Sequence, residues 1–192
     1  IKKNIPVFSG LGGGSSNAGT IIKYFTRGKI LSKQNINYFS KIVGSDFRIF
    51  LKSSQVFQKN IFNVVNIKKK YNFYFILVFP FLKCSTREIY SRVKIYKNIN
   101  NCSFYKTKSK TKLIEYLKSK DNSLEKIVIS KFPVIKKILF KLNLIKGCHF
   151  SRVTGSGSAC FGLFLDRKSA LLGQKKIKKI FPKFWCVIGK TI

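Results

Sequence analysis

The chain has 192 residues, of which 45% are hydrophobic, so it can build a core and is not a wholly disordered protein. Its 39 Lys and Arg against 6 Asp and Glu give a formal charge of +33, and its longest apolar run, residues 73–82, is too short to span a membrane. Five cysteines without a C-x-x-C pair argue against a disulfide framework and a zinc site, which favours reduced, mostly buried thiols.

The first part of the chain predicts a loop, two helices and short strands. Residues 6–14 form a loop because of their glycines, and Ser15 or Ser16 can cap a helix that runs through Phe25. Ser32 begins a second helix, which ends at Gly44. The remaining predicted elements of this part are strands over residues 47–51 and 55–65.

Lys68-Lys69-Lys70 is a polar break, and we place a domain boundary near residue 70. A strand over residues 73–79 follows, apolar on both faces as a central strand would be. The other predicted elements are, in chain order, a helix over 86–93, a polar loop over 98–112, helices over 112–117 and 123–142 with a kink or division at Pro133, strands over 149–153 and 160–165, a helix over 168–180 and a strand over 184–188. This order predicts an α+β fold with helices on one face of an antiparallel sheet.

The strongest functional signal is the glycine-rich segment Pro6-Val7-Phe8-Ser9-Gly10-Leu11-Gly12-Gly13-Gly14-Ser15-Ser16. It is not a Walker A loop, because no Gly-Lys-Ser/Thr follows, and it is not the dinucleotide fingerprint, because it opens a helix directly. Glycines let the backbone approach an anion, and the free N–H groups of the helix favour negative charge. The two serines add hydroxyl donors or a path to a metal. The segment therefore predicts a phosphate-binding loop, with an ordinary glycine-rich turn as the alternative.

Two other segments allow two interpretations each. Asp46, one of only six acidic residues, follows a helix-ending glycine and is either a functional carboxylate or a turn residue. Gly155, Ser156 and Gly157 lie between two predicted strands, where they form either a simple hairpin or a turn that approaches a ligand closely. His149 is the only histidine, and we interpret it as structural.

The positive charge also has two interpretations. Dense lysine neutralises the phosphates of a polyanion. The lysines, however, occur in every segment and accompany abundant Ile, Asn, Phe and Tyr, which share A/T-rich codons. We therefore favour biased codon usage and expect no specific nucleic acid and no membrane as partner.

In order and spacing, these segments resemble the motifs of the GHMP family of small-molecule kinases. Residues 10–18 resemble its nucleotide-binding motif, residues 43–46 the segment with its catalytic aspartate, and residues 154–157 its third motif. Ser85-Thr86-Arg87-Glu88-Ile89-Tyr90 and Asn122-Ser123-Leu124-Glu125 are similar to segments of the branch that phosphorylates a cytidine-diphosphate derivative of a methylated sugar alcohol in isoprenoid biosynthesis. The resemblance covers nearly the whole chain.

The resemblance implies a two-domain α+β fold, with part of a ribosomal-protein-S5-like α/β domain over residues 1–70 and a ferredoxin-like domain over residues 71–192. It implies ATP and Mg²⁺ as cofactors and a small-molecule substrate, in a cytoplasmic monomer or weak homodimer (in the plastid stroma if plastid-derived). Asp46 is the expected catalytic base, Pro6 to Ser16 the expected ATP-binding residues, and no residue is expected to bind a metal directly. The expected substrate-binding residues are Thr86, Tyr90, Gly155, Ser156 and Gly157.

The sequence departs from the family in two places. The family usually has Asp-Val-Pro-Phe-Phe where this chain has Asp46-Phe47-Arg48-Ile49-Phe50, and Gly19 replaces a common Ala. Because the chain begins at Ile1 and contains no Met, we expect a preceding segment that carries the family's active-site lysine and its Asp-Gly-Tyr-His sequence. The alternatives are another GHMP kinase, or a non-catalytic basic relative that binds nucleic acid.

Overall fold

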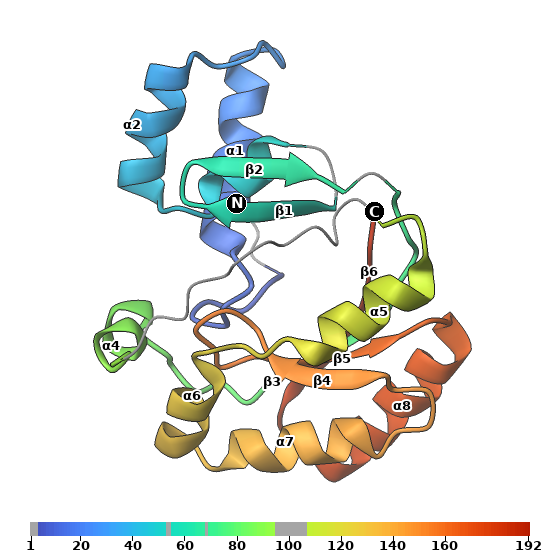
Figure 1. Ribbon diagram of the computed structural model, residues 1–192. Coiled ribbons are helices and arrows are strands. Elements are labelled where there is room, and N and C mark those ends of the chain that lie inside the picture. The colour runs from blue at the N-terminus through green and yellow to red at the C-terminus, as the bar shows by residue number, and fades with distance from the viewer. Residues whose placement is uncertain (1–3, 53–54, 68, 95–106) are drawn as a thin grey trace. The chain divides into compact units, whose positions relative to one another are not determined.

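The computed structural model describes residues 4–52, 55–67, 69–94 and 107–192 (Figure 1). The chain forms two compact units, which we call the sheet unit and the helical unit. The described part of the sheet unit is residues 4–11, 71–94 and 109–191, and that of the helical unit is residues 12–52, 55–67, 69–70, 107–108 and 192. Within the described residues, no helix is long and apolar enough to cross a membrane.

The helical unit contains three helices and a β-hairpin in its described part. Its elements are α1 (Gly13–Phe25), α2 (Lys33–Val43), α3 (Phe47–Leu51), β1 (Val56–Asn60) and β2 (Asn63–Asn66). Ser32 caps α2 as predicted, because its Oγ accepts a hydrogen bond from the N–H of Asn35 at 3.2 Å. The single strand predicted over residues 55–65 is instead a hairpin, whose turn forms because the side-chain oxygen of Asn60 accepts from the N–H groups of Phe62 and Asn63, both at 2.9 Å.

The strand predicted over residues 47–51 is wrong, because these residues form α3. In a helix, residues three apart share a face, whereas in a strand they point to opposite faces. Phe47 is fully buried and its ring lies 5.9 Å from that of Phe39 in α2, while the Cβ of Phe50 lies 3.0 Å from the position that a side chain at Gly19 of α1 would occupy. Only a helix lets both rings pack against the neighbouring helices, so packing outweighs the β propensity of this short segment.

The sheet unit has a four-stranded antiparallel sheet in the order β4-β5-β3-β6. Its elements are β3 (Tyr74–Phe79), α4 (Thr86–Ser91), α5 (Lys110–Ser119), α6 (Glu125–Lys131), α7 (Val134–Asn143), β4 (Phe150–Val153), β5 (Cys160–Phe164), α8 (Arg167–Ile180) and β6 (Trp185–Lys190). The predicted division at Pro133 is confirmed, since this proline separates α6 from α7. Two crossovers through helices and one hairpin give the ferredoxin-like pattern, and the predicted α+β class is confirmed.

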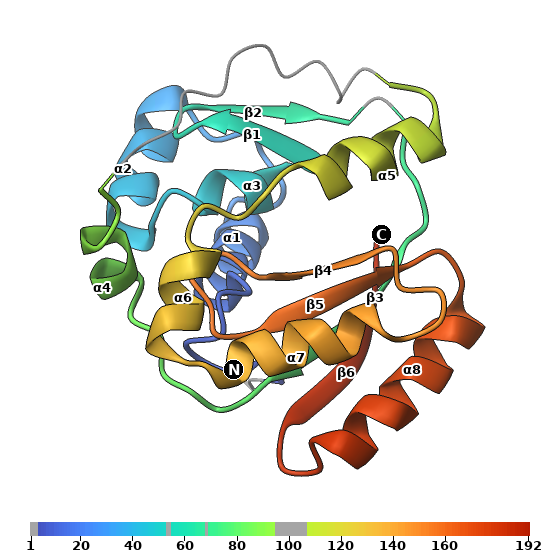
Figure 2. The same ribbon diagram turned by 60° about the horizontal axis from the view of Figure 1, so that its bottom comes forward.

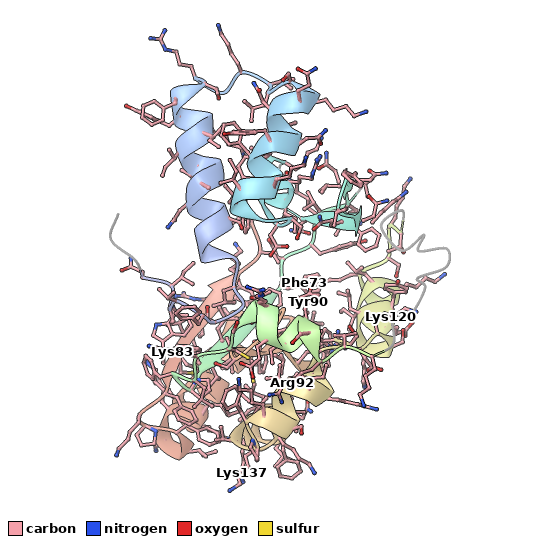
Figure 3. The ribbon with its side chains drawn as sticks, turned by 90° about the vertical axis from the view of Figure 1, so that its left-hand side faces the viewer. Phe73, Lys83, Tyr90, Arg92, Lys120 and Lys137 are labelled. Atoms are coloured by element: carbon pink, nitrogen blue, oxygen red, sulfur yellow. The ribbon has the colours of Figure 1, made fainter. Side chains whose placement is uncertain are left out.

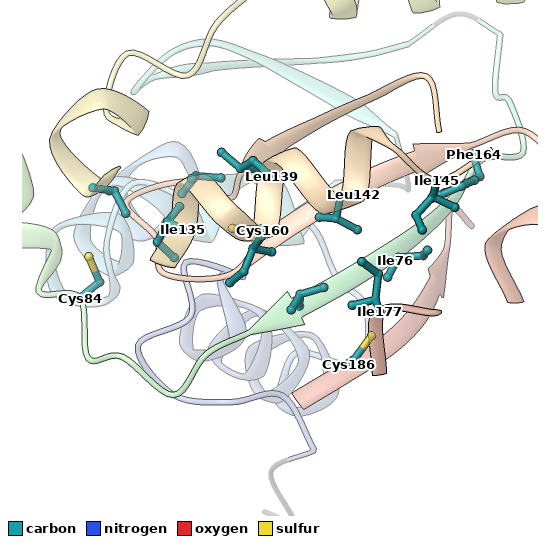
Figure 4. Close-up of a cluster of buried hydrophobic side chains, with 14 of the residues drawn as sticks. Ile76, Cys84, Ile135, Leu139, Leu142, Ile145, Cys160, Phe164, Ile177 and Cys186 are labelled. Carbon is teal, nitrogen blue, oxygen red and sulfur yellow. The ribbon is translucent and has the colours of Figure 1, made fainter. Parts of the chain in front are cut away.

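The helices α7 and α8 cover one face of this sheet (Figure 2). The core between these helices and the sheet is built mainly from aliphatic side chains, with cysteines and Phe164 (Figure 4). Ile138 and Leu142 of α7, Ile177 of α8 and Ile76 of the central strand β3 are all fully buried. The strand predicted to be central therefore is central, and the sheet supplies a rigid base for the β4–β5 turn.

The predicted domains, residues 1–70 and 71–192, differ from the compact units at the start of the chain. Residues 4–11 belong to the sheet unit, because the backbone of Ser9 is hydrogen-bonded to the β4–β5 hairpin. The chain passes between the units again at residues 70 and 71. The assignment of these segments as evolutionary domains stays a prediction. Part of the predicted polar loop, Cys102 and Lys68 lie outside the described residues.

Candidate functional site

Within the sheet unit, the start of the glycine-rich segment contacts the turn between β4 and β5. The buried Ser9 accepts two hydrogen bonds on its carbonyl oxygen, from the N–H of Ala159 at 3.1 Å and from the hydroxyl of Thr154 at 2.9 Å. Its own hydroxyl donates to the carbonyl of Pro6 at 2.7 Å, which holds the segment in a compact loop. Two motifs that lie 145 residues apart in sequence are thus joined through backbone groups.

The contact continues at Gly10, where only glycine fits. Its φ is +72°, and a Cβ at this position would lie 2.3 Å from the carbonyl oxygen of Thr154 and 2.9 Å from that of Gly157. Across the contact, a Cβ on Gly155, whose φ is +47°, would lie 3.1 Å from the carbonyl oxygen of Gly10. Gly10 and Gly155 were predicted to let the backbone approach a ligand. In the structure they let the glycine-rich segment and the β4–β5 turn approach each other.

The remainder of the glycine-rich segment begins α1 in the helical unit. The predicted cap at Ser15 or Ser16 is wrong, because α1 starts at Gly13 and its N-cap is Gly12, with a left-handed φ of +66° and no side-chain cap. The N–H of Ser16 makes the first intrahelical bond, to the carbonyl of Gly12 at 2.9 Å. The preceding N–H groups of the first turn have no acceptor within the helix, as at every helix start, and they can donate to an anion.

Asp46 occupies the N-cap position of α3 in the helical unit. Its backbone is helical, its side chain caps nothing, and the residue is exposed. No ion pair within 4.0 Å involves its carboxylate among the described residues. Arg48 faces other partners: its guanidinium donates to the side-chain oxygen of Asn37 and lies 5.7 Å over the ring of Phe62. The carboxylate of Asp46 is therefore accessible to a ligand.

The predicted substrate-binding residues come together in part. The hydroxyl oxygens of Thr86, at the start of α4, and of Ser156, in the β4–β5 turn, are 2.9 Å apart, so one donates to the other. Tyr90 lies one turn further along the same face of α4 and is half exposed (Figure 3). Gly155 and Gly157 flank Ser156 in the turn, so four of the five predicted residues lie at this hydrogen bond or next to it in sequence.

An ion-pair cluster holds α4 against α6. Glu88 pairs with Lys131 and, at 3.0 Å, with Arg92. The hydrogen bond from Lys131 is the largest cause that lowers the pKa of Glu88. Nearby, burial raises the pKa of the Cys84 thiol. No group of three or more His, Cys, Asp and Glu side chains that could hold a metal ion occurs in the part of the chain that the structure describes.

Two further residues hold the turn, and the sequence alone assigns them no contact. The side-chain amide of Asn122 donates to the carbonyls of Val153 and Gly155, at 3.0 and 2.7 Å, and the carboxylate of Glu125 accepts from the N–H of Val153 at 2.8 Å. The sequence signal that could have indicated these contacts is the spacing of Asn122 three residues before Glu125, one of the few acidic residues, in a segment that resembles the kinase family.

Comparison with known proteins places this geometry in context. Residues 107–183 match the family described as GHMP kinases C terminal. The chain is 32% identical to a 4-diphosphocytidyl-2-C-methyl-D-erythritol kinase of Pelagibacter ubique over 99% of its own length and 67% of the relative's. It is also 32% identical to the enzyme of that name from Anaplasma marginale, over 96% of the chain and 65% of the relative. It thus spans about two thirds of the length of these relatives.

Solved structures of two kinases share the fold. A crystal structure of 4-(cytidine 5'-diphospho)-2C-methyl-D-erythritol kinase aligns with a TM-score of 0.67 and 20% identity, over 99% of this chain and 68% of the other. The homoserine kinase from Cytophaga hutchinsonii aligns with a TM-score of 0.73 and 14% identity, over the same shares of the two chains.

Proposed function

The chain belongs to the GHMP kinase family, and within it to the 4-diphosphocytidyl-2-C-methyl-D-erythritol kinases; on this premise we propose that it phosphorylates the 2-hydroxyl of 4-diphosphocytidyl-2-C-methyl-D-erythritol with ATP, a step of non-mevalonate isoprenoid biosynthesis. ATP-dependent phosphotransfer is the reaction that the family implies.

One observation carries the proposal: the glycine-rich segment and the glycine turn, both predicted to contact ligands, are bonded to each other through Ser9, Gly10 and Thr154. A phosphotransferase must hold the phosphate donor and the acceptor hydroxyl at a fixed separation and orientation. The same turn contacts Thr86, at the start of the helix proposed to bind the acceptor. This arrangement supports one site with a donor side and an acceptor side.

The proposed nucleotide-binding residues are Pro6 to Ser16. The absence of a side-chain cap on α1 supports this role, since a capping oxygen would compete with phosphate for the first-turn N–H groups. Gly14 is exposed, and a Cβ there would meet nothing within 4 Å, so the helix start is open to a ligand within the helical unit.

Asp46 is the proposed catalytic base, which accepts or orients the proton of the attacking hydroxyl. Its exposed carboxylate and the engagement of Arg48 with Asn37 support this role. Thr86 and Tyr90 are the proposed contacts of the acceptor, and the half-exposed ring of Tyr90 is proposed to stack on the cytosine base. Gly155, Ser156 and Gly157 are proposed to close the acceptor side.

Mg²⁺ fits this site as the partner of the nucleotide rather than as a resident ion. A Mg²⁺ ion commonly keeps several waters and is held by substrate phosphates with one or two protein oxygens. The hydroxyls of Ser15 and Ser16 in the first turn of α1 are proposed to donate to the nucleotide or to the waters of the ion, and no residue is proposed to bind the metal directly. When bound, the ion neutralises charge that develops on the phosphates.

The test is a phosphorylation assay with the full gene product, ATP and Mg²⁺, in which product formation is followed by mass spectrometry and ³¹P NMR. We expect transfer to the 2-hydroxyl of 4-diphosphocytidyl-2-C-methyl-D-erythritol and none to homoserine, the acceptor of the kinase that shares the fold. Phosphorylation of homoserine in preference would refute the proposed substrate while leaving the family in place.

The role of Asp46 is tested with Asp46→Asn, which keeps the shape of the side chain but removes the base. We expect kcat to fall about 10²-fold or more, with little change in nucleotide affinity. The control is Asp166→Asn at the N-cap of α8, where an amide oxygen can still accept from the N–H of Ser169. Near-normal turnover of Asp46→Asn would make Asp46 a turn residue only.

A further inference from the structure

We infer that Asn122, together with Glu125, is a positioning residue that sets the place of the β4–β5 turn and, through this turn, of both the nucleotide segment and the acceptor helix. This inference rests on the proposed function. It concerns residues that touch the turn and not the reacting atoms, and it follows from a continuous set of hydrogen bonds within the sheet unit.

The first observation is where the two side chains attach. β4 is an edge strand, and its last residue, Val153, directs its N–H and its carbonyl away from β5. Glu125 accepts from this N–H and Asn122 donates to this carbonyl, so two side chains stand where a further strand would otherwise pair. Because Val153 is 2% exposed, its polar groups would be costly to leave without these partners.

The second observation is that Asn122 fits in only one orientation. Its side-chain oxygen accepts from the N–H of Leu124 at 3.0 Å, and its NH₂ group donates to two carbonyls, those of Val153 and Gly155. A side chain that accepts on one side and donates twice on the other must be a primary amide of this length. An aspartate keeps the bond to Leu124 but turns a charged oxygen toward two carbonyl oxygens.

The third observation is that the β4–β5 turn is hydrogen-bonded to other segments, so its position determines theirs. Thr154, which lies between the two carbonyls held by Asn122, bonds to the carbonyl of Ser9, and the N–H of Ala159 does the same. On the other side of the turn, Ser156 contacts Thr86, and the hydroxyl of Ser158 donates to the carbonyl of Leu82 at 2.6 Å. A displaced turn therefore disturbs the donor side and the acceptor side together.

This coupling separates a positioning role from the alternatives. A residue that binds one ligand changes the affinity for that ligand, and the removal of a general base lowers kcat. A residue that only stabilises the fold lowers the melting temperature but leaves the affinities of the folded protein unchanged. Loss of the Asn122 amide should instead weaken the binding of ADP and of the acceptor in parallel, in protein that is still folded.

The experiment compares Asn122→Asp and Asn122→Ala with the wild type in the full gene product, and uses Asn143→Asp, at the exposed end of α7, as the matched control. ADP affinity is measured by calorimetry, acceptor KM by the phosphorylation assay, and folding by thermal melting. Backbone exchange of Gly157 and Ala159, whose N–H groups bond to Thr154 and Ser9, is followed by NMR.

We expect Asn122→Asp to weaken ADP binding and raise the acceptor KM by about tenfold each, because one or two hydrogen bonds are worth roughly that factor. Exchange at Gly157 and Ala159 should become faster. Asn122→Ala should show a smaller effect, because it removes the donors without adding repulsion. Lowering the pH from 8 to about 5 should partly restore the Asn122→Asp variant relative to Asn122→Ala, because the two carbonyl oxygens raise the pKa of the new carboxyl and its protonated form regains one donor.

The inference is overturned if Asn122→Asp binds both ligands as the wild type does, if only one ligand is affected, or if Asn143→Asp gives the same change. ADP affinity and amide exchange need no turnover. If the wild type phosphorylates a different acceptor, the proposed substrate fails while these two measurements still decide the role of Asn122.

Discussion

Replacement of Gly10 by alanine tests the contact between the two glycine motifs most directly. A non-glycine residue at positive φ costs about 1–2 kcal/mol. The added Cβ would also lie 2.3 Å from the carbonyl oxygen of Thr154, a backbone atom that cannot swing away. Forcing extra atoms into a packed site costs about 1–3 kcal/mol more. We therefore expect Gly10→Ala to reduce the free energy of unfolding by about 3 kcal/mol.

The chain supplies matched controls for each part of this estimate. Gly28 has a φ of +74° with nothing within 4 Å of an added Cβ, so Gly28→Ala isolates the backbone cost of about 1–2 kcal/mol. Gly14 lies in α1, also with nothing within 4 Å, so Gly14→Ala should leave stability unchanged or raise it by up to about 1 kcal/mol. The difference between Gly10→Ala and Gly28→Ala measures the clash alone.

The assay is urea unfolding followed by circular dichroism, with melting temperatures as a second readout. For a chain of this length, 3 kcal/mol corresponds to a decrease of about 6–12 °C in Tm. Gly10→Ala should also weaken ADP binding, because the residue belongs to the proposed nucleotide segment. Equal stability of Gly10→Ala and Gly28→Ala would contradict the close approach of Gly10 to the carbonyl oxygen of Thr154.

Three further predictions concern charge and thiols. Glu88→Gln should lower stability at pH 7, and the difference from the wild type should vanish on acidification. The reason is that the lowered pKa of Glu88 gives stability that is present above the ordinary pKa of 4.5 and is lost as the pH falls through the lower pKa of the folded state. Urea midpoints at pH 7 and pH 3 measure this, and an unchanged difference in stability at pH 3 would contradict it. Burial raises the pKa of Cys148 and of Cys186 to about 11. Iodoacetamide should therefore label both thiols slowly at pH 8 in the folded protein and rapidly in urea, as followed by mass spectrometry. Equal labelling rates in the two conditions would argue against burial. With a charge of +33, binding to DNA should be indifferent to sequence and decline steeply with salt, and tight binding to one sequence that survives about 200 mM salt would favour the nucleic-acid alternative.

Much of the sheet unit could be predicted from sequence because its signals are local. The apolar run that forms β3, the proline that divides α6 from α7 and the glycine turn between β4 and β5 each act over a few residues. Their order was enough for the α+β class. The helical unit was harder, because α3 contains aromatic and β-branched residues and is helical only through the packing of Phe47 and Phe50 on other helices.

The candidate site divides in the same way. The glycine-rich segment and the turn at residues 154–157 could be recognised as motifs, because glycines that allow close backbone approach and serines that donate hydrogen bonds occur there in short local patterns. That Ser9 and Thr154 bond to each other was not visible, since no local pattern reports a contact between residues 145 positions apart. Asn122 was missed for the same reason: a single amide has many possible partners, and only the folded chain selects the carbonyls of Val153 and Gly155.

The side chains of Asn122 and Glu125, which bond to the backbone at the end of β4, also affect whether another protein can pair with this strand. An exposed strand edge is a template on which another chain can add a strand, by intermolecular β-augmentation or aggregation. Asn122 and Glu125 already use the outward N–H and carbonyl of Val153, and the guanidinium of Arg152 reaches back to the carbonyl of Leu117 in α5. The bonds that position the turn thus also occupy this edge at its Val153 end, so a variant without them would leave the N–H and carbonyl of Val153 free to pair with a further strand.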